Sequence, residues 1–182
     1  MFDQALATIT RRLDDAKAKD LIQHYALIGG FAVSAWGIPR ATQDVDFALA
    51  LGSTNPSALA DHLNAEFASG DIHDPLQGVF RLQLSVQGQN IPVQLIILPP
   101  RWTAIVMDSV VTLSVLGCRI PVISWEGLIL LKLYAGGPQD LLDAQRIISV
   151  RQPTGDEIEK LSRLAAQVDL QTDFQNLVEP AS

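Results

Sequence analysis

The sequence predicts a mixed α/β fold, in which helices flank a mixed sheet and further helices follow at the C-terminal end. Three patterns indicate it: apolar runs with a strand-like period of two, two pairs of such runs around glycine-containing turns, and helical periodicity after Ser124. The elements do not alternate as a strict β-α-β repeat. At 182 residues, the chain is expected to form an α/β core over residues 1–123, with a helical part over residues 124–182 packed on it.

The first elements are predicted from their periodicity. Apolar side chains recur at three- and four-residue steps over residues 2–22, which is typical of an amphipathic helix. An apolar run over residues 25–28 then predicts a strand that ends at Gly29-Gly30. Residues 31–36 suit a short helix, and a period of two predicts the next strand over residues 45–49.

The remaining elements follow from caps and turns. Asn55-Pro56 favours a helix start, and the apolar stripe of that helix extends to Phe67. Two hairpins are predicted, with strands over residues 79–86 and 91–98, then 110–115 and 119–123. Three helices are predicted over residues 126–135, 138–150 and 156–168, the last with a capping box of Thr154 and Glu157. The final dozen residues are expected to be loose.

Composition limits the classes of function. The chain has 13 Lys and Arg against 20 Asp and Glu, a net charge of −7, and a pI of about 4.8. A broad basic surface for duplex nucleic acid is therefore not expected, although a local basic groove for RNA stays open. Cys118 is the single cysteine, so an internal disulfide is excluded.

No membrane segment is expected. The charge-free stretches over residues 21–39 and 82–100 are interrupted by polar residues, glycine and proline, and a span needs about 20 mostly apolar residues. The N-terminus has Asp3 and no Lys or Arg before Arg11, unlike a secretory signal. We expect a soluble cytoplasmic protein.

Two patterns between residues 26 and 49 suggest chemistry. Gly29-Gly30 lies between a strand and a helix, where glycine lets a ligand approach the backbone and the helix offers free N–H groups to an anion such as a triphosphate. Asp44 and Asp46 leave the same face of a strand, with Cα atoms about 6.6 Å apart, and could share Mg²⁺. Each pattern alone is more often a turn or a solvated strand face.

Together the two patterns resemble the signature of the DNA polymerase beta-type nucleotidyltransferases, in which a glycine pair precedes an Asp-x-Asp doublet. The wider segment GGFAVSAWGIPRATQDVDFAL is similar to AbiEii-type abortive-infection toxins and related minimal nucleotidyltransferases. The resemblance implies a nucleotidyltransferase fold and nucleotide-binding roles for four residues: Gly29, Gly30, Ser34 and Arg40. It also implies that Asp44 and Asp46 are catalytic and hold Mg²⁺, with room for a second ion.

A second segment, from Leu131 to Asp143, is similar to a Lys-x-x-Ala…Asp-x-x-Asp motif of the same group. The resemblance implies that Lys132 faces the phosphates and that Asp140 supports the site. Alternatives stay open: Lys132 could extend its head to water, and Asp140 could complement a helix dipole. Likewise Asp143 could pair with Arg146, and Arg40 could pair with Asp44 or Asp46.

The implied reaction moves a nucleoside monophosphate from a nucleoside triphosphate to a hydroxyl on RNA, a protein or a small molecule. A toxin role would add a cognate antitoxin protein as a partner. One position departs from the family: the third carboxylate expected on a later strand corresponds to Gln94, which cannot act as a base. The alternative is therefore a degenerate, non-catalytic nucleotide- or partner-binding module. Candidate substitutes for the acid are Asp71, Asp74 and Asp108.

Overall fold

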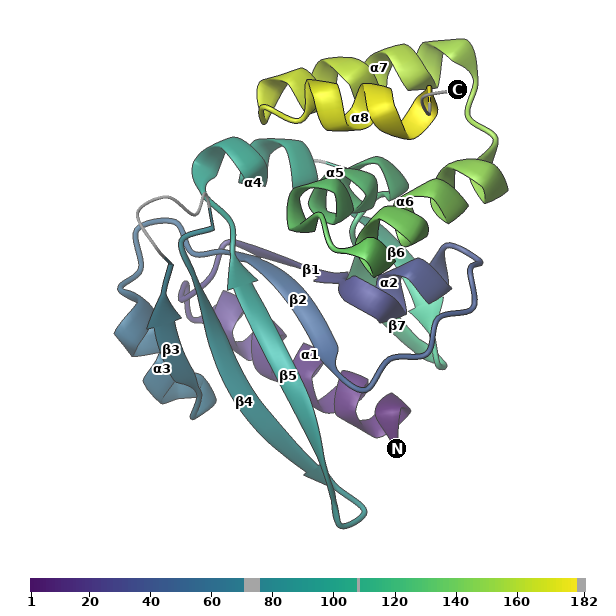
Figure 1. The fold of residues 1–182 in the computed structure, drawn as a ribbon. Coiled ribbons are helices and arrows are strands. Elements are labelled where there is room, and N and C mark those ends of the chain that lie inside the picture. The colour runs from purple at the N-terminus through teal and green to yellow at the C-terminus, as the bar shows by residue number, and fades with distance from the viewer. Residues whose placement is uncertain (71–75, 108, 180–182) are drawn as a thin grey trace.

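The structure is a computed structural model that describes residues 1–70, 76–107 and 109–179. Its centre is a seven-stranded mixed sheet with the order β3-β4-β5-β2-β1-β7-β6 (Figure 1). The β1–β7 and β2–β5 pairs are parallel, and the other neighbours are antiparallel. The strands are β1 His24–Ile28, β2 Val45–Ala50, β3 Glu66–Ser69, β4 Gly78–Val86, β5 Gln89–Ile97, β6 Val111–Val115 and β7 Cys118–Val122. The mixed α/β prediction is confirmed.

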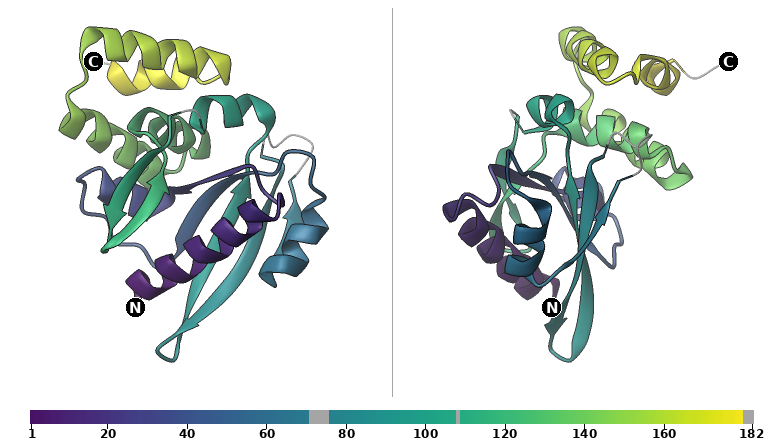
Figure 2. Two further views of the ribbon diagram at one scale, coloured as in Figure 1. Left: turned by 180° about the vertical axis from the view of Figure 1, so that it is seen from behind. Right: turned by 90° about the vertical axis from the view of Figure 1, so that its left-hand side faces the viewer.

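Helices cover both faces of the sheet. One face carries α1 and α3, and the other carries α2 and α5, with α6 alongside α5 (Figures 1 and 2). The last two helices, α7 and α8, lie against each other beyond α5 and α6, farther from the sheet. The helices are α1 Phe2–Ala18, α2 Gly29–Ala35, α3 Pro56–Leu63, α4 Pro100–Val106, α5 Trp125–Ala135, α6 Pro138–Arg151, α7 Gly155–Gln167 and α8 Gln171–Val178.

Several helix boundaries form for the reasons that the sequence indicates. The Asn55 side chain accepts a hydrogen bond from the Ser57 N–H, with proline in the first turn of α3. Thr154 and Glu157 form the full capping box at the start of α7. These caps satisfy N–H groups that a helix start leaves without an intrahelical partner.

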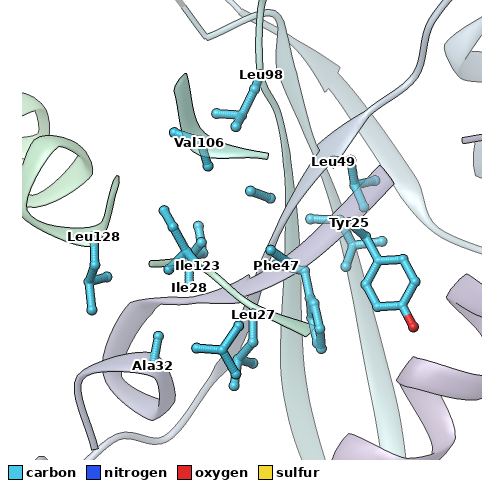
Figure 3. Packing of buried hydrophobic residues seen from close by; sticks show 14 of the residues in the cluster. Tyr25, Leu27, Ile28, Ala32, Phe47, Leu49, Leu98, Val106, Ile123 and Leu128 are labelled. Atoms are coloured by element: carbon cyan, nitrogen blue, oxygen red, sulfur yellow. The ribbon is translucent and has the colours of Figure 1, made fainter. Parts of the chain in front are cut away.

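A continuous hydrophobic core fills the space between the sheet and its helices. Tyr25 and Phe47 pack edge to face on the α1 side of the sheet, and the Tyr25 hydroxyl donates a hydrogen bond to Asp14 of α1. Ala32 of α2 and Leu128 of α5 lie on the other side (Figure 3). The core includes apolar side chains from every strand except β3, and from the C-terminal helices.

Two predictions at the element level are wrong, and one helix was missed. The apolar stripe assigned to one helix ends at Leu63, because Asn64 adopts a left-handed conformation (φ 51°) that terminates α3, and Phe67 belongs to β3. Helix α4 was not predicted, although two prolines precede its apolar turn. The last dozen residues are not all loose, because α8 forms there and buries Phe174 in the core.

Within the described ranges, we find no helix that combines the length and apolar character needed to cross a bilayer.

Candidate active site

Asp46 and Gly29 lie against each other where β1 passes into α2. Asp46 pairs across the sheet with Ile28, the last residue of β1. Gly29 has a φ of 66°, a conformation that favours glycine. A Cβ on Gly29 would overlap Asp46 Oδ2 and lie 2.9 Å from Asp46 Cγ. Glycine at this position therefore leaves the space that the Asp46 carboxylate occupies.

Gly30 affects the position of the Asp44 carboxylate indirectly, through Thr42. A Cβ on Gly30 would lie 2.7 Å from Thr42 Cβ, so the absence of a side chain lets Thr42 pack there. Thr42 Oγ1 in turn donates a hydrogen bond of 2.7 Å to Asp44 Oδ1. The glycine pair thus makes room for Asp46 directly and for the residue that holds Asp44.

The two carboxylates form an uncompensated negative pair. Burial raises the pKa of Asp46 to about 7, the charge of Asp44 adds to the increase, and the Lys132 ammonium opposes it. Neither carboxylate forms an ion pair with any residue that the structure describes. Two adjacent carboxylates that form no ion pair with a described residue favour binding of a cation.

Lys132 is buried in α5 and lies between two carboxylates of α6. Its Nζ atom is 2.7 Å from Asp140 Oδ1 and 3.1 Å from Asp143 Oδ2. Arg40 Nε lies 3.4 Å from the same Asp143 oxygen. Two of the open alternatives are therefore excluded: Arg40 forms an ion pair with neither Asp44 nor Asp46, and Asp143 pairs with Lys132 and Arg40 rather than with Arg146.

Asp143 is fully buried and strongly held. Burial alone would raise the pKa of its carboxyl group, but hydrogen bonds from Gln139 and Lys132 and the charges of Lys132 and Arg40 lower it. The two cations and the two acids of this cluster, Asp140 and Asp143, cancel one another. The cluster therefore orients the Lys132 ammonium without neutralising Asp44 and Asp46.

A cavity of about 280 Å³ brings part of the predicted site together. Gly29, Asp46, Lys132 and Asp140 line it, among apolar side chains from β5 and α5. Gly30, Ser34, Arg40 and Asp44 are not among its lining residues. Ser34 Oγ instead donates a hydrogen bond of 3.4 Å to the Arg40 carbonyl, and so ties α2 to the loop that follows it.

Two residues of this arrangement were not included in the candidate site on the basis of the sequence. Thr42 stands two residues before Asp44. A hydroxyl at this spacing can reach a nearby carboxylate, so this contact could be predicted from the sequence. Asp143 follows Asp140 by three residues and shares its helix face, so a second acid near Lys132 was also predictable. Its contact with Arg40, 103 residues away, depends on the tertiary structure.

The position of the expected third carboxylate is occupied by an amide. In the parallel β2–β5 pair, Gln94 is the register partner of Asp46. Asp71, Asp74 and Asp108 lie outside the described residues. Among the residues that are described, no group of three or more His, Cys, Asp or Glu side chains could hold a metal ion. Among the described residues, the carboxylates of Asp44 and Asp46 are oxygen donors of the kind that a hard cation prefers, and such a pair suits Mg²⁺ when phosphate and water oxygens complete the set.

Comparisons with known proteins agree with this architecture. No protein-family model and no curated protein matches the chain. Among solved structures, an antigenic nucleotidyltransferase-like protein from Paracoccidioides brasiliensis matches with a TM-score of 0.57 at 20% identity, over 95% of this chain and 91% of that one. The crystal structure of ANT(2")-Ia in complex with adenylyl-2"-tobramycin matches with a TM-score of 0.53 at 14% identity, over 94% of this chain and 99% of that one. The chain therefore has a nucleotidyltransferase-like fold.

Proposed function

We propose that this protein is a Mg²⁺-dependent nucleotidyltransferase that moves a nucleoside monophosphate from a nucleoside triphosphate to an acceptor hydroxyl. The observation that carries the proposal is the Asp44–Asp46 doublet, which has no ion pair with a described residue and of which Asp46 lines a cavity together with Gly29 and Lys132. The fold is consistent with it, and one protein of similar fold was crystallised with an adenylylated compound, adenylyl-2"-tobramycin.

Asp44 and Asp46 would hold the metal ion. When bound, Mg²⁺ would neutralise negative charge on the triphosphate and on the leaving pyrophosphate. Asp46 must lose its proton to act as a ligand, and its raised pKa makes that loss dependent on pH. Thr42 keeps the Asp44 carboxylate in place through its hydrogen bond.

In the transfer step, the acceptor hydroxyl oxygen forms a bond to the α-phosphorus. The bond from that phosphorus to the bridging oxygen breaks, and pyrophosphate leaves with the electron pair. Lys132 faces the phosphates, and Asp140, 2.7 Å from its Nζ atom, fixes the direction of the ammonium. The hydroxyl proton passes to solvent, because the amide of Gln94 cannot accept it.

The test is label transfer from each α-labelled nucleoside triphosphate, with Mg²⁺, to total RNA, cell extract or small hydroxyl compounds. The Asp44→Asn/Asp46→Asn double variant should lose transfer by at least about 10³-fold, the scale on which electrostatic groups contribute to such reactions. Asp173→Asn, at an exposed aspartate of α8, is the matched control and should retain it. No transfer to any acceptor by the wild type, or equal transfer by the double variant, would contradict the proposal.

A non-catalytic nucleotide-binding module is the second candidate, and Gln94 beside Asp46 favours it. In that case calorimetry would detect Mg²⁺-dependent nucleotide binding without turnover. Transfer activity of the Gln94→Asp variant would then show whether the protein is a decayed enzyme or a dedicated binding protein. A gain of transfer activity in this variant indicates the decayed enzyme, and unchanged inactivity indicates the binding module.

The toxin role stays a prediction from the resemblance alone. It predicts growth arrest when the chain is expressed by itself, and rescue by a cognate antitoxin protein. Normal growth at a high level of folded protein would contradict it.

A further inference from the structure

A row of side chains crosses the sheet from the candidate site to its edge. Asp46 of β2 pairs with Gln94 of β5, Gln94 pairs with Arg81 of β4, and Arg81 pairs with Glu66 of β3. Register partners project from the same face of a sheet, and neighbouring strands lie about 4.8 Å apart. Arg81 is thus two strands, or roughly 10 Å, from the Asp46 backbone.

The surface beside this row is hollow and adjoins the candidate site. Arg81 and Gln94 line a cavity of about 330 Å³. Leu76 and Ile96 line both this cavity and the one that holds Asp46 and Lys132. The two cavities are therefore neighbours, with these apolar side chains as their common wall.

The hollow continues from Arg81 onto the opposite layer of the molecule. Arg81 also lines a depression of about 540 Å³, together with Asn64 and Gln83. These two amides in turn line a depression of about 600 Å³ that contains Arg11 and Arg12. β3 begins at Glu66, opposite Arg81, so the part of β4 after Arg81 has no strand partner on this edge, and the path reaches α1 around it. We call this path, marked by Arg81, Arg11 and Arg12, the arginine groove.

The charge of the arginine groove differs from that of the whole chain. Its three arginines are exposed, and none forms an ion pair with a described residue, in a protein whose net charge is −7. Among the described residues, two acids also line it. Asp15 is already engaged by Lys19, at 2.8 Å, and by His62, at 3.2 Å. Glu66 is exposed. Among the described residues that line the path, it is the one acid that forms no ion pair.

We propose that the acceptor is a single-stranded nucleic acid, whose phosphates contact the arginine groove and whose hydroxyl end reaches the Asp44–Asp46 doublet. This inference rests on the proposed function and adds the substrate class. Free guanidinium groups spaced along a continuous groove suit a chain of phosphates, and they oppose a cationic acceptor. Gln94 supports the same acceptor, because an amide beside the doublet does not repel phosphate as a third carboxylate would.

The test is fluorescence anisotropy of the full chain with labelled single-stranded RNA and DNA oligonucleotides of about 12 nucleotides, at several salt concentrations. Three phosphate contacts predict a salt slope near −2, since each contact contributes about −0.7 on a single strand. Arg81→Glu should weaken binding about tenfold, and the Arg11→Glu/Arg12→Glu variant should weaken it further, each with a shallower slope. Comparison of the RNA and DNA arms identifies which nucleic acid is preferred.

Two further variants separate recognition from misfolding. Arg119→Glu reverses an exposed arginine on β7, away from the groove, and should bind like the wild type. Glu66→Gln removes the acid beside Arg81 and should tighten binding about threefold, a gain that a damaged protein would not give.

The outcomes distinguish this inference from the proposed function. Salt-independent or absent binding, equal loss in Arg119→Glu, or label transfer only into protein or a cationic amino sugar would overturn the inference. If Mg²⁺-dependent nucleotide binding persists in that case, the proposed function survives. Groove-dependent oligonucleotide binding without nucleotide binding would instead retain the groove and reject the transferase.

Discussion

Both faces of the central sheet pack against apolar side chains, but among the described residues only one of them also buries charged groups. On the face covered by α1, Phe47 and Leu49 of β2 are fully buried and apolar. On the opposite face the same strand presents Asp46, and α5 and α6 bring Lys132 and Asp143 into the interior. Burying charge is unfavourable unless it is paired. The face covered by α1 therefore contributes only to stability. The opposite face is less stabilising, because it holds charged, reactive groups in fixed positions.

The largest expected effect on stability comes from removing a buried aromatic side chain from the apolar face that α1 covers. Phe47→Ala should lower the free energy of unfolding by about 3–5 kcal/mol, because it opens a cavity beside Tyr25 in a fully buried layer. Urea denaturation measures the loss. At a temperature where the variant remains folded, its nucleotide affinity should equal that of the wild type. A selective loss of affinity would show that the two faces are not independent.

The next effect comes from the charged face. Asp143→Ala leaves Lys132 and Arg40 without their shared acid and should cost roughly 3 kcal/mol. The pKa of Asp143 is lowered, so its stabilisation is present above the unfolded value of 3.8 and is lost as the pH falls below it. Urea denaturation at neutral and at acidic pH should show the difference between wild type and variant shrinking in acid. A constant difference would contradict an electrostatic role.

Asp46 should behave in the opposite way. Its pKa of about 7 in the folded protein exceeds the unfolded value of 3.8, so the native state binds more protons between these limits and loses stability as the pH rises through them. Asp46→Asn removes this loss and should be the more stable protein at pH 8 by roughly 2 kcal/mol, allowing for partial exposure of the carboxyl group. Thermal denaturation without metal measures the gain, and saturating Mg²⁺ should reduce it. A variant less stable than wild type at pH 8 would rule out this account.

The smallest effect is expected outside both faces. Arg163 and Glu159 form an exposed pair of 3.2 Å on α7, one turn apart. Arg163→Ala should change the free energy of unfolding by less than about 0.5 kcal/mol and leave nucleotide binding intact. This variant calibrates the other measurements, since a larger change would mean that α7 contributes more to the core than its contacts indicate.

Much of the candidate site could be predicted from local sequence, because its parts follow strand and turn chemistry. The glycine pair follows the preceding strand as expected, but β2 begins at Val45, so Asp46 lies in the strand and Asp44 precedes it rather than sharing its strand face. The partners of Arg40 and Asp143 could not be predicted, because their contact joins a loop to a helix 103 residues later. Likewise β3 has only one apolar aromatic residue, and it forms because β4 offers an edge for pairing.

The sequence by itself determined the mixed α/β class, the periodic elements, their caps and the residue types of the doublet, since all of these depend on neighbours within a few positions. Tertiary structure decided that Lys132 is held by two acids, that Gln94 is the register partner of Asp46, and that arginines from α1 and β4 line adjoining depressions. The physical reason is that strand order and helix packing bring these groups together, and no local pattern encodes the order of strands in a sheet.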